Sequence, residues 1–217
     1  TCLAQAAIKE VEWVQFSDQH WINTYYVPSC TDTFEIRARL SKTDVTQAFW
    51  CSRTELTKDT MTLFLLSGKL RFDRNTNTAT TSSTSIAAET DYTVVANYAT
   101  GKATVNGTDA GITMATGDFS CSMPVILGAS AVNYTSIGNY NTGRLYGFKV
   151  SNAEGTVLHN FVPAYDDDRS LYGLYDTIAK RFSRVCGPGA STGAAVAAEA
   201  TEFSSEEWTD HTVINVP

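Results

Sequence analysis

The sequence predicts an all-β fold, an antiparallel two-sheet β-sandwich or jelly roll. Apolar and polar residues alternate with a period of two through most of the chain, which is typical of strands with one buried face. Short turn sequences rich in Gly, Asn and Ser separate these segments, and no long helices connect them as a parallel sheet would require. With 217 residues, of which 43% are hydrophobic, the chain is long enough to form one sizeable core.

The N-terminal half contains a half-buried strand and a hairpin. Residues 33–40, TFEIRARL, place apolar and charged side chains on opposite faces. Residues 61–74, MTLFLLSGKLRFDR, predict two strands joined by a turn at Ser67 and Gly68. The Thr- and Ser-rich residues 75–90 predict a surface loop. Further strands are predicted at residues 92–98 and 103–105, with reversals at Thr100-Gly101 and Asn106-Gly107.

The C-terminal half continues the strand pattern. The apolar segment 123–130 predicts one strand, and 145–150 and 157–162 predict two strands around a turn. Two segments have a helical composition. They are DTIAKRF, 176–182, and the alanine-rich AAVAAEA, 194–200.

Composition excludes several classes of function. The chain has 16 basic and 23 acidic residues, a formal net charge of -7, which disfavours binding to nucleic acid. No apolar run approaches the about 18 residues that a membrane span needs. The five cysteines are far apart with no C-x-x-C motif, so buried free thiols are favoured, and one long-range disulfide is left open.

Several motifs together resemble the concanavalin A-like, laminin G-like jelly-roll domains of secreted bacterial and phage-borne proteins. The most specific are GRLYGFKV, NFVPA and GLYD, within a match that spans residues 7–189. The resemblance implies two curved antiparallel sheets that recognise carbohydrate or protein surfaces. We therefore expect a lectin-like domain at 1–189 and a C-terminal extension at 190–217, either an attachment segment or an added edge strand. In that frame the expected scaffold residues are Arg144, Phe148, Phe161, Pro163, Tyr172 and Tyr175.

Catalysis is not expected. Glycoside hydrolases need two carboxylates roughly 5 to 9.5 Å apart, and no E-x-D-x-E type of run is present. Glu10 and Glu12 could share one face of a strand, but solvated edge charges are the favoured interpretation. Residues 189–193, GASTG, fit a nucleophile elbow, with Asp210 and His211 downstream. The antiparallel character of the chain favours a loop there instead.

No cofactor is predicted. His20, His159 and His211 lack metal-ligand spacing, so structural or surface roles are favoured. Residues 166–168, three consecutive aspartates, leave calcium at a rim loop as an alternative to a solvated turn.

The predicted binding surface combines aromatic rings with amides, which suit the C–H faces and hydroxyls of a sugar. VNYTSIGNYNTG supplies most of it, Trp21 is a second candidate, and Trp50 is expected in the core. The candidate ligand-binding residues are Asn133, Tyr134, Asn139, Tyr140, Asn141 and Trp21.

Together these observations predict a non-catalytic lectin-like domain that binds a glycan or a protein surface outside the cytoplasm, on a cell surface or a virion. The alternative is a virion decoration or fibre protein that assembles as a homo-oligomer or attaches through its tail. A glycoside hydrolase is the third hypothesis.

Overall fold

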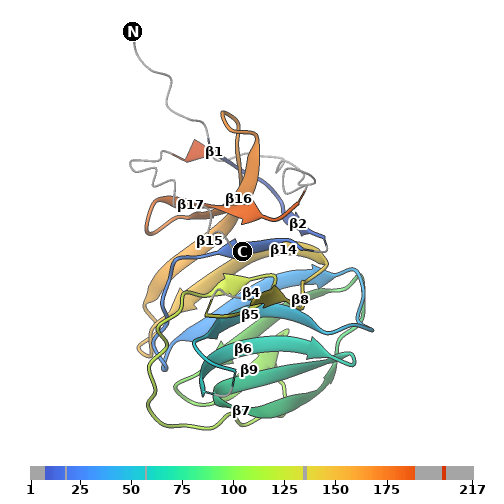
Figure 1. Cartoon of the computed structure of the whole chain (residues 1–217), viewed down its shortest axis with the longest axis vertical. Helices are drawn as coiled ribbons and strands as arrows, with labels where there is room; N and C mark the ends of the chain where they lie inside the picture. Colours follow the sequence, from blue (N-terminus) through green and yellow to red (C-terminus); the bar gives the residue numbers. More distant parts are fainter. Residues whose placement is uncertain (1–7, 18, 57, 134–135, 189–201, 204–217) are drawn as a thin grey trace.

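The computed structural model describes residues 8–17, 19–56, 58–133, 136–188 and 202–203, and every regular element in these ranges is a β-strand. All strand pairs are antiparallel, which confirms the predicted fold class. All of these strands except β12 and β13 form one continuous ladder that divides into two sheets. β7 lies at the end of the molecule away from β1, β16 and β17 (Figure 1).

The first sheet is built around the long strands β4 and β14. Its order is β10-β9-β8-β4-β14-β15-β16-β17, with β2 pairing the start of β14 and β1 pairing both β15 and β18. Its strands are β1 (Ile8–Glu10), β2 (Val14–Phe16), β4 (Thr33–Leu40), β8 (Asp91–Asn97), β9 (Lys102–Val105), β10 (Thr108–Asp109), β14 (Gly143–Ser151), β15 (Val157–Asp166), β16 (Leu171–Asp176), β17 (Arg181–Cys186) and β18 (Glu202–Phe203).

The second sheet has the order β3-β11-β5-β6-β7 and joins the first where β3 pairs β17. A separate hairpin of β12 and β13 lies next to β5. The strands of this part are β3 (Trp21–Asn23), β5 (Gln47–Arg53), β6 (Lys58–Leu66), β7 (Lys69–Ser85), β11 (Ile126–Leu127), β12 (Ser130–Val132) and β13 (Ser136–Gly138).

One apolar core lies between the two sheets. Phe34 and Phe148 of the first sheet meet Trp50 of the second, with ring centroids 5.6 and 6.2 Å from the indole. The indole Nε1 donates a 2.9 Å hydrogen bond to the Tyr98 hydroxyl. Trp50 is fully buried, as its sequence context predicts. The two layers are therefore held by one shared core.

The loop predicted at 75–90 is wrong for residues 75–85, because β7 continues to Ser85, and is confirmed for residues 86–90, which connect β7 to β8. Threonine is β-branched and fits the pleated surface of a strand, so a polar Thr-rich segment need not be a loop. The edge of this extension is also tied down, since the Ser83 N–H donates to the Ala110 carbonyl at 3.0 Å.

The single strand predicted at 123–130 is divided in two. Gly128 has φ +79°, and a Cβ there would lie 3.0 Å from the ring of Phe16. A positive φ does not fit a regular strand, so β11 ends before this residue and β12 starts after it.

The segment 176–182, whose composition is helical, forms no helix: Asp176 ends β16, residues 177–180 are the turn of the β16–β17 hairpin, and Arg181 begins β17. The Asp176 carboxylate accepts the Ile178 N–H at 3.0 Å, and Lys180 has φ +55°. Aspartate side chains favour such local turns over helix interiors. The other predicted helix, 194–200, lies outside the described residues.

A bulge interrupts the pairing of β14 with β4. Leu145 pairs Ala38 and Gly147 pairs Arg37, so Tyr146 is the extra residue. Leu145 and Phe148 both point into the core, three positions apart. Consequently Tyr146 and Gly147 both lie on the outer face of the first sheet.

Four cysteines lie in the described part of the chain, and all are free thiols. Cys51 and Cys121 are buried, which agrees with the interpretation favoured from the sequence. Burial raises the pKa of the Cys121 thiol to about 11. No helix long and apolar enough to cross a membrane occurs among the residues that the structure describes.

Candidate functional site

The outer face of the second sheet, turned away from the shared core, carries a polar cluster. Alternation along β6 sends Leu63 into the core and Thr62 and Phe64 to the outer face. The register of the β6–β7 pair then places Thr62 opposite Asp73 of β7, and Phe64 opposite Arg71. Side chains separated by several residues in the sequence thus become direct neighbours.

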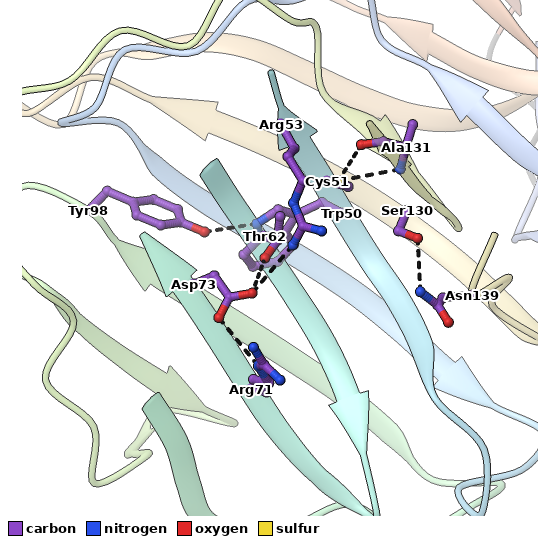
Figure 2. A network of polar contacts seen from close by, with 10 residues as sticks. All are labelled: Trp50, Cys51, Arg53, Thr62, Arg71, Asp73, Tyr98, Ser130, Ala131 and Asn139. Carbon is purple, nitrogen blue, oxygen red and sulfur yellow. Dashed lines mark hydrogen bonds and ion pairs between the residues drawn. The ribbon is translucent and has the colours of Figure 1, made fainter. Parts of the chain in front are cut away.

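Asp73 is at the centre of this cluster and is fully buried. Its carboxylate accepts hydrogen bonds from the Thr62 hydroxyl at 3.1 Å and from Arg71 Nε at 3.3 Å (Figure 2). The Nη2 of Arg53 lies 3.5 Å away from the same carboxylate. Since two guanidinium groups share one carboxylate, the cluster keeps a net positive charge.

Arg53 keeps an unused donor. Its side chain is 9% exposed, and its guanidinium lies over the ring of Phe64, 5.5 Å from the centroid. The Nε atom is buried and has no hydrogen-bond partner within the described part of the chain. An unsatisfied buried donor costs about 1–3 kcal/mol, so an additional acceptor at this site would be stabilising.

The β12–β13 hairpin forms the neighbouring wall. The Cys51 thiol donates to the Ala131 carbonyl at 3.2 Å, and burial raises the pKa of this thiol. At the far end of the hairpin, the Asn139 carbonyl accepts the Ala48 N–H at 2.8 Å, and Asn139 Nδ2 donates to Ser130 Oγ at 3.0 Å (Figure 2). These bonds hold the asparagine side chain in place beside the cluster.

Together these elements border a pocket of about 210 Å³. We call it the Arg53 pocket. Apolar walls lie beside cationic donors, a carboxylate and an amide, the combination that gives a small-molecule site both contact area and orientation. The lining residues are Thr46, Arg53, Phe64, Leu66, Arg71, Asp73 and Asn139.

The binding residues predicted from the sequence do not come together in one site. Asn139 lines the Arg53 pocket. Asn133 is exposed outside it, although its N–H donates to the Arg53 carbonyl at 3.2 Å. Asn141 is buried, and its N–H donates to the Gly128 carbonyl. Tyr134 lies outside the described residues.

The two remaining aromatic candidates take part in packing. Tyr140 and Trp21 both contact a small apolar cluster that includes Ile126 and Ala131. The Tyr140 hydroxyl donates to the Ile137 carbonyl at 3.1 Å. Neither ring lines the Arg53 pocket.

Six of the seven lining residues were not among the candidates predicted from the sequence: Thr46, Arg53, Phe64, Leu66, Arg71 and Asp73. Arg71 and Asp73 alternate with Leu70 and Phe72 in the predicted hairpin, so the sequence places both charged side chains on the face away from the core. Their convergence with Arg53 and Phe64 depends on strand register, which no local pattern reports.

The candidate catalytic carboxylates lie elsewhere. Glu10 pairs with Ala164 in the β1–β15 ladder, and Glu12 is exposed. Residues 189–193, with the proposed nucleophile pattern, lie outside the described residues. His159 is half-buried on β15, where its Nδ1 lies 2.5 Å from the carboxylate of Asp176.

Two of the three aspartates considered for calcium use their carboxylates in local contacts. The Asp166 carboxylate accepts the N–H groups of Asp168 and Arg169 and pairs with the Arg169 guanidinium at 3.0 Å. Asp167 pairs with Lys9. Among the described residues no group of three or more His, Cys, Asp or Glu side chains is placed to hold a metal ion.

The fold is that of lectin-like jelly rolls. No protein-family model matches the chain, and no curated protein matches its sequence. The CBM40 domain of the IT-sialidase from Ruminococcus gnavus is 13% identical with a TM-score of 0.52, covering 74% of this chain and 95% of that one.

Two further solved structures share this fold. A candidate carbohydrate-binding protein from Bacteroides ovatus is 13% identical with a TM-score of 0.51, covering 94% of this chain and 61% of its own. The NanB sialidase from Streptococcus pneumoniae is 13% identical with a TM-score of 0.54, covering 66% of this chain but only 26% of that one. At such identities the similarity establishes the fold, which hosts many functions.

Proposed function

We propose that the chain is a non-catalytic carbohydrate-binding domain and that the Arg53 pocket is its binding site. The observation that carries this proposal is the pocket's composition. Arg53 supplies a buried donor without a partner in the described chain, Asp73 supplies a fixed acceptor, and Phe64 and Leu66 supply apolar walls. A pyranose ring, with hydroxyls at its edge and C–H groups on its faces, matches this combination.

The solved structures with the same fold support the proposal. One of them is a CBM40 domain solved with α2,6-sialyllactose bound, and another is described as a candidate carbohydrate-binding protein. Their sequence identity is too low to transfer a ligand. A location outside the cytoplasm, expected from the resemblance to secreted jelly-roll domains, stays a prediction.

Glycan-array binding with two matched variants tests the site. Asn139 and Asn133 are both exposed, both have positive φ of 48° and 46°, and both lie by the same hairpin, but only Asn139 lines the pocket. Glycine accepts such a φ without strain, so Asn139→Gly and Asn133→Gly both remove an amide side chain without straining the backbone, and Asn139→Gly also removes the hydrogen bond to Ser130. We expect Asn139→Gly to weaken saturable glycan binding about tenfold, the loss of one or two hydrogen bonds, and Asn133→Gly to leave it unchanged.

Equal weakening by both variants, or none by Asn139→Gly, would refute the pocket as the site. Absence of saturable binding, together with a defined oligomer in light scattering of the same sample, would favour the structural-assembly alternative. Turnover of a glycan substrate by the wild-type chain would overturn the non-catalytic part of the proposal.

A further inference from the structure

The outer face of the first sheet carries a second set of charged and aromatic side chains, on the layer opposite the Arg53 pocket. Arg37 of β4 lies at its centre, between a hollow of about 140 Å³ on the β15 side and one of about 110 Å³ on the β8 side. Both hollows are bordered by Arg37 and Tyr146. We call this surface the Arg37 face, formed by Glu35, Arg37, Asp91, Thr93, Tyr146 and Lys149.

Register explains why space remains on both sides of Arg37. Its neighbour on β14 is Gly147, which has no side chain, and its neighbour on β8 is the small Thr93. The β14 bulge also turns Tyr146 to this outer face, beside that glycine. The exposed guanidinium is therefore flanked by open volume rather than by packed side chains.

The charges on this face leave Arg37 uncompensated. Glu35 pairs with Lys149 at 2.8 Å. Asp91 makes a two-point contact with Arg39, at 2.7 and 2.9 Å. Arg37 has no ion pair or hydrogen bond with any residue that the structure describes. An exposed cation without a partner thus stands between two hollows, in a protein whose formal net charge is -7.

We propose that the Arg37 face is a second binding site, for a sugar that carries one negative charge as a carboxylate or a sulfate ester. A guanidinium binds such planar or tetrahedral anions through two parallel hydrogen bonds. The ring of Tyr146, which borders both hollows, offers flat apolar surface for the pyranose beside the guanidinium. Because both carboxylates of the face already have cations, a single free guanidinium matches a monoanion, whereas a doubly charged phosphate monoester would need a second free cation.

This inference is independent of the carbohydrate site proposed above. The two surfaces share no residue and lie on opposite layers, so either could fail while the other stands. If both hold, the domain engages two saccharide units at once.

The test is an NMR titration of the full 217-residue chain with methyl β-glucuronoside, glucose 6-sulfate and neutral methyl β-glucoside, observing backbone amides. We expect saturable shifts at Arg37, Thr93 and Gly147 with at least one anionic sugar, and none there with the neutral one. Preference between the two anionic probes distinguishes a carboxylate from a sulfate ligand. Raising the salt from about 50 to about 500 mM should weaken the binding, since exposed charges are screened.

Arg37→Gln should weaken binding of the anionic sugar about tenfold, because a charge-assisted pair is lost. Arg184→Gln on β17 causes the same change in net charge away from the face and should have no effect. Asn139→Gly, in the Arg53 pocket, should also have none. The proposal is overturned if neither anionic sugar shifts these amides, if the neutral sugar binds equally well, or if Arg184→Gln weakens binding as much as Arg37→Gln.

Discussion

Asp176 shows how a single buried carboxylate can make stability depend on pH. Its side chain is fully buried, and it accepts hydrogen bonds from His159 and from the N–H groups of Asn160 and Ile178. Burial opposes ionisation of Asp176, but these hydrogen bonds outweigh burial and lower the pKa of its carboxyl. The ionised carboxylate therefore stabilises the folded chain.

Linkage between protonation and folding gives the direction in which stability changes with pH. A carboxyl whose pKa is lowered in the folded state stabilises the fold at pH values above its unfolded-state pKa of about 3.9. This contribution is lost as the pH falls through the folded-state pKa. We expect Asp176→Asn to lower the free energy of unfolding by about 1–3 kcal/mol at pH 7, since the buried contacts weaken. The difference from wild type should shrink at about pH 3 and below.

Urea denaturation at both pH values measures the effect. Asp44 is exposed and gives a matched control, because Asp44→Asn removes the same charge without buried contacts. A loss for Asp176→Asn that is as large at pH 3 as at pH 7 would contradict the assignment.

At the level of elements, the close approach of β16 and β17 depends on Gly173. It pairs with Arg184, and a Cβ at this position would lie 2.2 Å from the Ser183 carbonyl oxygen. The backbone here has no positive φ, so the restriction is purely steric. Two strands that must approach this closely have no room for even a methyl group.

We therefore expect Gly173→Ala to lower the free energy of unfolding by roughly 1–3 kcal/mol through overpacking, measured by urea denaturation. Gly138 on β13 is a matched control, since it also lacks a positive φ but has no atom within 4 Å of the added Cβ. Gly138→Ala should be close to neutral. Equal losses in the two variants would mean that backbone freedom, rather than the close approach, decides the cost.

The turn between β16 and β17 and the bulge in β14 were not predicted from the sequence, although each left a signal. Asp176 at the start of DTIAKRF favours a turn, whereas the segment was interpreted from its helical composition. In GRLYGFKV the core residues Leu145 and Phe148 are three apart, which breaks the period of two where the bulge occurs. A short segment holds too little periodic information to decide such cases alone.

At the scale of the whole molecule, a hydrogen bond between the side chains of Trp50 and Tyr98 links the two layers through the core. Trp50 comes from the second sheet and Tyr98 follows β8 of the first, and both are fully buried. Burial also raises the pKa of the Tyr98 hydroxyl, which stays a neutral hydrogen-bond partner at ordinary pH. The indole N–H has no other partner among the described residues, so this contact satisfies an otherwise costly buried donor.

Tyr98→Phe should consequently destabilise the chain by about 1–3 kcal/mol, because the Trp50 N–H is left unpaired. The midpoint of urea denaturation, followed by tryptophan fluorescence and by circular dichroism, measures it. Both probes should move together, since a single core joins the sheets. Tyr172→Phe, at a partly buried ring that packs at a tilt against Tyr165, should change the free energy of unfolding by less than about 0.5 kcal/mol. Separate transitions by the two probes would mean that the sheets unfold independently.

The sequence by itself determined the fold class, most strand positions and the core face of each strand, such as Phe34 and Ile36 inward with Arg37 outward. These features are local, because side-chain direction in a strand follows from alternation alone. Only the tertiary structure decided which outward side chains meet. Arg53 reaches Asp73 because the strand register aligns β5, β6 and β7. Arg37 lies beside Gly147 and Thr93 because of the register of β4 and the bulge in β14. These strands are far apart in the chain, and no local pattern specifies such long-range pairing.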